Sequence, residues 1–257
     1  MTGKPLEGPK IDINGPSSGL KVAGIDGCRA GWIAFVHDGN SVTSRIIRSD
    51  AGLRELFLEC DRVYIDMPVG LAETGQRACD TELRNAMPPA KKASVFMTPV
   101  RGAVYAANYR QACDLNLQSA GRKISIQAWN ITNRIRQVDQ LLRADASLAT
   151  RVIECHPEWQ FIQFSGAAMP PKKTTLGIEA RIEQLETIFP GAPVHFSELM
   201  ATLKRKEVQP DDILDAMVLM VAARLSALGA AVRSFPEQLV HDPFGLPMNI
   251  RYADRVG

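Results

Sequence analysis

The sequence has few cysteines, little net charge and no long hydrophobic run, and each shortage excludes a class of protein. The five cysteines are odd in number and widely spaced, which argues against a disulfide framework or a zinc cluster and favours a cytoplasmic setting. The net charge of +2 is too small to attract a polyanion, so a nucleic-acid contact would need a local basic patch. No apolar run reaches the ~18 residues that span a bilayer, so we expect no membrane contact.

The chain is long enough for one large domain. Its 257 residues are 46% hydrophobic, which allows a sizeable core. Residues 1–19 are polar and contain several Gly and Pro, so we predict a flexible N-terminal tail followed by a single domain over 20–257. The pattern leaves open a homodimer formed through apolar helices.

From residue 20 onward the pattern predicts three consecutive strands, a helix and a fourth strand. The first strand runs to Asp26, the second covers 31–37, and the turn HDGN leads into a third in SVTSRIIR. The segment SDAGLRELFLEC has a capping residue and apolar residues at helical spacing, and RVYIDMPVG is a short strand that ends in Asp66. A right-handed crossover would place this strand parallel to the first.

The rest of the chain is mainly helical. Helices are expected over 74–86, 102–119 and 127–146, then a strand that carries Glu154, then helices over 175–189, 195–206 and from Pro210. This order is typical of a ribonuclease H-like α/β fold. We therefore predict three layers, with helices on both faces of a mixed central sheet and a helical insertion at about 72–148, after the fourth strand.

Five carboxylates occur where strand and helix ends would converge. Asp26 and Asp66 would reach the same edge of the sheet, and Glu154 lies on the next strand. Asp212 and Asp215 share one face of the last helix. Several hard oxygen ligands in one cleft are suited to Mg²⁺ or Mn²⁺, and two such ions about 3.5–4 Å apart can cleave a phosphodiester.

Each acid also has a structural interpretation. Asp212 follows Pro210 and could cap the helix, where an acid also interacts favourably with the dipole. Asp66 could form a turn, and Asp26 could accept N–H groups from the step GCRAG. Asp215 is harder to explain in this way because its neighbours belong to a hydrophobic helix.

Other polar residues are candidates for supporting roles. His156 could act as a general acid or base, or it could cap the helix that begins at Pro157. Four basic residues could hold phosphate oxygens, although charged loop residues are often only solvated. They are Arg29, Arg101, Lys172 and Lys173.

Nine segments together resemble the DUF429 family, described as predicted ribonuclease H-like nucleases. They are GIDGCRAGW, IDMPVGL, RACDTELR, SVFMTPVR, IQAWNI, ECHPEWQF, KKTTLGIEAR, DDILDAM and DPFGLPMNI, within residues 22–252. The resemblance implies a ribonuclease H-like fold, with metal-binding acids at Asp26, Asp66 and the pair Asp212 and Asp215. Glu154 has no firm counterpart in the resolvases of this superfamily, and the insertion departs from their plan.

Three functions remain open at this point. We favour a divalent-metal-dependent nuclease that hydrolyses RNA or DNA through a two-metal site, with all five carboxylates as ligands. A nucleotide-handling phosphotransferase is a weaker alternative, because only GIDGCRAG resembles a phosphate loop. A non-catalytic module that binds nucleic acid or assembles with other proteins is the third hypothesis.

Overall fold

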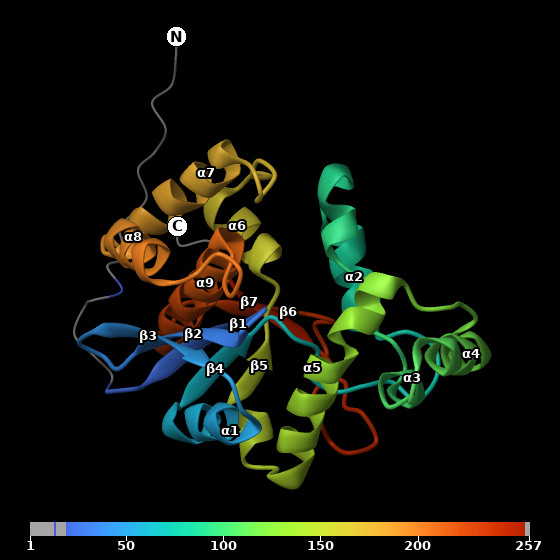
Figure 1. The fold of residues 1–257 in the computed structure, drawn as a ribbon. Helices are drawn as coiled ribbons and strands as arrows, with labels where there is room; N and C mark the ends of the chain where they lie inside the picture. Colours follow the sequence, from blue (N-terminus) through green and yellow to red (C-terminus); the bar gives the residue numbers. More distant parts are fainter. Residues whose placement is uncertain (1–12, 14–18, 255–257) are drawn as a thin grey trace.

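The computed structural model describes residue 13 and residues 19–254 (Figure 1). Most of the predicted tail over 1–19 lies outside the described residues. Ile13 is buried, and its backbone N–H donates to the carbonyl of Ile188 at 3.5 Å.

A mixed five-stranded sheet forms the centre of the molecule. Its strands are β1 (Val22–Cys28), β2 (Gly31–His37), β3 (Val42–Ile47), β4 (Arg62–Ile65) and β5 (Val152–Glu154). The order across the sheet is β3-β2-β1-β4-β5. The first three strands form an antiparallel meander, whereas β4 and β5 run parallel to β1. This arrangement confirms the predicted fold class.

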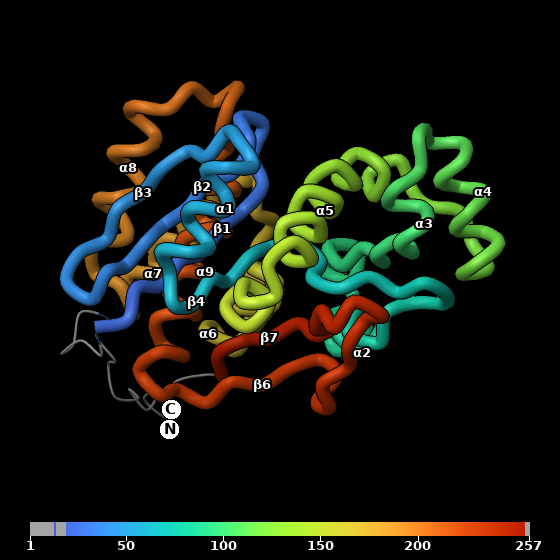
Figure 2. Tube along the Cα trace, turned by 90° about the horizontal axis from the view of Figure 1, so that it is seen from below, coloured from blue at the N-terminus to red at the C-terminus, as the bar shows by residue number. Residues whose placement is uncertain are grey.

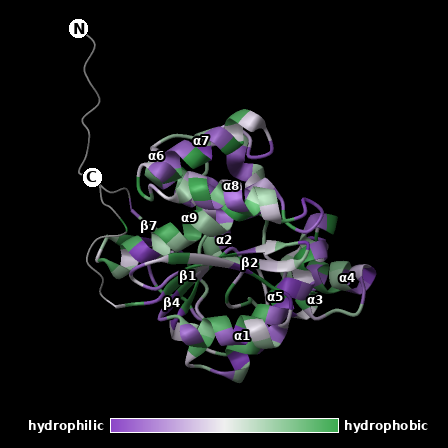
Figure 3. Cartoon of the chain, turned by 60° about the vertical axis from the view of Figure 1, so that its left-hand side comes forward, coloured by the Kyte–Doolittle hydropathy of each residue, from purple (hydrophilic) through white to green (hydrophobic). Residues whose placement is uncertain are grey.

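Helices cover both faces of the sheet, which gives three layers (Figure 1). One face carries α6 (Pro157–Ser165), α7 (Thr175–Glu186), α8 (Ala192–Thr202) and α9 (Pro210–Ala227), and the other carries α1 (Asp50–Glu59) and α5 (Ile126–Ala144). Helix α9 is largely hydrophobic (Figure 3). It can be apolar on all sides because it lies between the sheet and α7 and α8.

Helix α9 approaches β1 more closely than a side chain would permit. A Cβ atom added to Gly24 would lie 2.0 Å from the backbone nitrogen of Met220 and 2.3 Å from the carbonyl oxygen of Ala216. Glycine at this position therefore lets helix and strand pack backbone against backbone. The contact brings the first turns of α9 close to the strand ends.

The predicted insertion lies between β4 and β5. It consists of α2 (Ala78–Ala86), the 3₁₀ helix η1 (Pro89–Ser94), α3 (Arg101–Val104), α4 (Tyr109–Ala120), α5 and η2 (Leu148–Thr150). Figures 1 and 2 show α2, α3 and α4 to one side of the sheet, with α5 bridging them to its lower face. The single helix predicted over 102–119 is wrong, because Asn108 starts a new helix by accepting a hydrogen bond from the Gln111 N–H at 3.0 Å.

A small antiparallel sheet near the C-terminus was not expected. It pairs β6 (Val232–Phe235) with β7 (Ile250–Ala253), and both strands contact α2 (Figure 2). No helix within the described residues is long and apolar enough to cross a membrane.

Candidate functional site

Asp26 and Asp66 lie side by side where the neighbouring strands β1 and β4 approach their carboxyl ends. Ile25 of β1 is level with Ile65 of β4, and the Asp66 N–H donates to the Ile25 carbonyl at 3.0 Å. Neighbouring strands are about 4.8 Å apart, so the two acids that follow these residues are adjacent. Strand β1 continues beyond Asp26 to Cys28, because Cys28 still pairs with β2.

A third acid, Asp215, reaches the same place from the start of α9. Its side chain is buried, and one oxygen, Oδ2, accepts a hydrogen bond from the Lys172 ammonium at 2.7 Å. The same ammonium lies 3.5 Å from Asp211. Asp26, Asp66 and Asp215 are called the acid cluster below.

The acid cluster is electrostatically unfavourable when all its members are ionised. Burial raises the pKa of Asp26 well above its ordinary value, and the charges of Asp66 and Asp215 raise it further. Burial and then Asp215 raise the pKa of Asp66 to about 7. Burial also raises the pKa of Asp215, against the opposing effect of Lys172. An additional cation would relieve this repulsion.

Asp212 lies beside the acid cluster but has a partner of its own. Its Oδ2 accepts a hydrogen bond from the Gln209 N–H at 2.8 Å, as part of a capping box at the start of α9. Burial raises its pKa to about 6, although this hydrogen bond opposes the shift. The capping role considered from the sequence is therefore present.

Glu154 belongs to a different group of side chains. Both its oxygens accept from the Arg77 guanidinium, at 2.6 and 2.9 Å, and Oε2 also accepts from the Val69 N–H at 2.8 Å. Arg77 in turn donates to Asp80 at 2.7 Å. Burial raises the pKa of Glu154 to about 7, and Arg77 is the main opposing influence. Arg77, Asp80 and Glu154 are called the ionic network below.

His156 caps α6. Its Nδ1 accepts from the Trp159 N–H at 3.2 Å, so Nε2 carries the proton and can donate to the carbonyl of Ser94, 3.3 Å away. Burial lowers its pKa to about 4. The ring is therefore neutral near pH 7, with a partner for each nitrogen.

The four basic candidates are scattered. Arg29 is exposed in the turn between β1 and β2, and Lys173 is exposed beside Lys172. Arg101 is buried in the insertion, where Nη1 donates to both oxygens of Asp139 at 2.7 and 2.6 Å. Among the four, Lys172 is the one whose ammonium pairs with a member of the acid cluster.

A cavity of about 260 Å³ opens beside Asp26 and Asp66. Its far wall comes from the insertion and includes Ser94, Phe96, Gln127, Ile131 and Arg134. The Arg134 guanidinium donates to the Cys28 carbonyl and lies 6.0 Å from the centre of the Trp32 ring. Arg134 was not identified from the sequence because it lies inside a regular helix, outside any motif.

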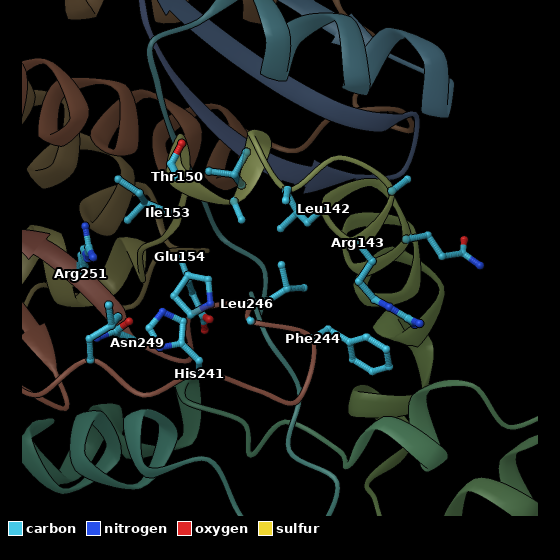
Figure 4. Close-up of a pocket in the computed structure, with 18 of the residues that line it drawn as sticks. Leu142, Arg143, Thr150, Ile153, Glu154, His241, Phe244, Leu246, Asn249 and Arg251 are labelled. Atoms are coloured by element: carbon cyan, nitrogen blue, oxygen red, sulfur yellow. The ribbon is translucent and has the colours of Figure 1, made fainter.

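A second cavity, of about 750 Å³, lies between α5 and the segment that leads to β7 (Figure 4). Its walls include Arg143, His241, Phe244 and Asn249. Glu154 is the one acid among its lining residues, and the ionic network already engages that carboxylate. The larger cavity therefore lacks the donor set of a metal centre.

The five predicted carboxylates do not together form a preformed metal-binding site. Within the described part of the chain, no three His, Cys, Asp or Glu side chains are close enough together to hold one ion as they stand. The donor chemistry at Asp26 and Asp66 nevertheless fits Mg²⁺ or Mn²⁺. The Asp66 carboxylate has no hydrogen-bond partner among the described residues, and Mg²⁺ commonly takes only one or two carboxylates together with water.

Comparison with known proteins identifies a family. The family described as protein of unknown function (DUF429) matches residues 24–239, which include most of β1, the other four strands of the central sheet and α9. No curated protein and no solved structure matches significantly. The chain belongs to the DUF429 family.

Proposed function

We propose that this protein is a metal-dependent nuclease that hydrolyses phosphodiester bonds in RNA or DNA, with Mg²⁺ or Mn²⁺ at the acid cluster. The observation that carries this proposal is the convergence of Asp26, Asp66 and Asp215 beside an open cavity. Burial and the charges of neighbouring carboxylates both raise the pKa values of Asp26 and Asp66. Perturbed acids that face a cavity are characteristic of functional sites.

Asp26 and Asp66 would hold the metal ion. Both line the 260 Å³ cavity, and their neighbouring positions on parallel strands let two carboxylates face the same ion. When bound, a divalent cation would withdraw electron density from the phosphodiester and favour attack by water. Asp215 would add negative charge from α9 and strengthen cation binding.

The cavity wall opposite the acids would position the substrate. Arg134 and Gln127 of α5 face this space together with Phe96. The guanidinium can pair with a phosphate oxygen, and an aromatic ring offers a surface for a base. In the reaction, the water oxygen bonds to phosphorus and gives up a proton to solvent, the ester P–O bond breaks, and the leaving oxygen takes a proton from solvent.

Hydrolysis of a defined set of nucleic acids tests the proposal. Single-stranded, duplex, hybrid and branched RNA and DNA would be incubated with the wild type and Asp26→Asn, each with Mn²⁺ or with chelator. We expect metal-dependent cleavage that falls at least about 100-fold in Asp26→Asn. The matched control, Asp114→Asn, changes an exposed acid on α4 and should cleave like the wild type.

Two outcomes would contradict the proposal. Cleavage that persists in Asp26→Asn would place the activity elsewhere. No cleavage of any substrate, together with metal-independent binding of one of them, would favour a non-catalytic module.

A further inference from the structure

Lys172 is fixed in place by the loop that carries it. The carbonyl of Pro170 accepts a hydrogen bond from buried Arg181 at 3.0 Å. The carbonyl of Pro171 accepts from the Thr174 N–H at 3.0 Å and the Thr174 hydroxyl at 2.8 Å. A Cβ atom on Gly177 would lie 2.0 Å from that same carbonyl oxygen, so the loop lies directly on the start of α7.

This fixed loop aims one ammonium group at the acids of α9. The Lys172 Nζ lies 2.7 Å from Asp215 and 3.5 Å from Asp211. Its charge also lowers the pKa values of Asp26 and Asp66, against the effect of their burial. One lysine thus serves as counter-ion to several acids.

The acids that come from α9 and those that come from the strands therefore differ in their partners. On the α9 side, Asp215 is paired with Lys172 and Asp212 with the Gln209 N–H. On the strand side, the Asp26 carboxylate accepts from the Gly27 N–H at 2.7 Å, and the Asp66 carboxylate has no hydrogen-bond partner among the described residues. A cationic side chain forms an ion pair with Asp215 on the first side, whereas within the described residues none forms an ion pair with Asp26 or Asp66 on the second.

We infer that this centre uses one divalent cation, held by Asp26 and Asp66, and that the Lys172 ammonium beside Asp215 takes the place of a second metal ion. The inference rests on the proposed function and replaces its two-metal form. In two-metal sites the second ion stabilises the leaving oxygen. Here the ammonium would stabilise that oxygen as the P–O bond breaks, and the oxygen takes its proton from solvent.

The number of bound Mn²⁺ ions tests the inference without an activity assay. Purified full-length protein would be titrated with Mn²⁺ alone, and bound metal would be measured by equilibrium dialysis and by the loss of the free-ion paramagnetic resonance signal. We expect one Mn²⁺ per wild-type chain. In Lys172→Met, Asp215 loses its counter-ion, so we expect a second ion or at least about ten-fold tighter binding.

Lys173→Met is the matched control. Lys173 is the next residue and its side chain is exposed, so this variant removes the same charge at a position that does not pair with the acids. It should bind Mn²⁺ like the wild type. Lys172→Gln would replace Lys172→Met if the latter fails to fold.

The outcomes separate the two proposals. Two Mn²⁺ ions on the wild type, or unchanged number and affinity in the folded Lys172 variant, would overturn the inference and leave the proposed function standing. No Mn²⁺ on the wild type would overturn the proposed function itself.

Discussion

Two groups of acids lie at the ends of the neighbouring strands β4 and β5, and their surroundings are opposite in kind. In the ionic network, both oxygens of Glu154 accept from Arg77, and Asp80 also accepts from the Thr98 N–H at 2.8 Å. In the acid cluster, Asp66 has no such partner among the described residues.

The neighbours of each group act differently on its charge. At Glu154 the largest influence after burial is Arg77, which lowers the pKa. At Asp66 it is another carboxylate, Asp215, which raises the pKa. A well-paired network stabilises the fold, whereas net repulsion among acids is typical of a site that gains its partner on binding.

The largest expected effect is on the ionic network. Arg77→Met would leave Glu154 and Asp80 buried without their shared cation, so we expect a loss of about 3–5 kcal/mol in the free energy of unfolding. Urea denaturation measures this loss. Arg29→Met, at an exposed arginine, should change it by less than about 0.5 kcal/mol. A loss below about 1 kcal/mol in Arg77→Met would show that the network is not structural.

The second largest expected effect is on the contact between Gly24 of β1 and the backbone of α9, which brings Asp215 close to the sheet. In Gly24→Ala, the new methyl group would meet the backbone of α9, so we expect a loss of about 3 kcal/mol and weaker Mn²⁺ binding. Gly102→Ala is the control, because a Cβ there meets nothing within 4 Å. If Gly24→Ala binds Mn²⁺ like the wild type, the position of α9 does not determine the site.

Removing a charge from the acid cluster should instead stabilise the fold. The pKa of Asp66 is about 7 in the folded chain and about 3.8 in the unfolded chain, so the folded state binds more protons between these values. The free energy of unfolding therefore falls as pH rises from 4 to 7. Asp66→Asn removes the part of this fall that Asp66 contributes.

Without metal, Asp66→Asn should match the wild type at pH 4 and exceed it at pH 8 by on the order of 2 kcal/mol. Urea denaturation at both pH values measures the difference. A variant less stable than the wild type at pH 8 would mean that Asp66 is paired in solution.

The smallest expected effect distinguishes two roles of His156. As a cap it should be replaceable, so His156→Asn should retain stability and cleavage, and His156→Ala should lose about 1 kcal/mol. Thermal unfolding and the nuclease assay measure both. Cleavage that falls about 100-fold in a stable His156→Asn would instead assign proton transfer to this ring.

The sequence was informative where local pattern determines structure. The apolar runs over 22–28 and 31–37 and the one after Pro210 predicted the sheet and α9. From these elements followed the meeting of Asp26, Asp66 and Asp215. The cap at Asn108 was also visible in the sequence, but the helical spacing on either side of it obscured the break.

Other features could not be predicted because they depend on partners distant in the chain. Glu154 pairs with Arg77, 77 positions away, and Arg101 pairs with Asp139, 38 positions away. Arg134 faces the acids only because α5 lies across the sheet edge. Residue type and spacing identify a buried charge, but they do not identify its partner.

The most direct test of the contrast between the two groups is thermal unfolding of the wild type, Asp66→Asn and Asp114→Asn, with and without Mn²⁺ at pH 7. At a concentration of about 100 times Kd, Mn²⁺ should stabilise the wild type by about 2.7 kcal/mol, which raises the midpoint by roughly 5–10 °C. Asp114→Asn should shift equally, and Asp66→Asn should not shift. No shift in the wild type, or an equal shift in Asp66→Asn, would contradict the assignment of the acid cluster as a cation site.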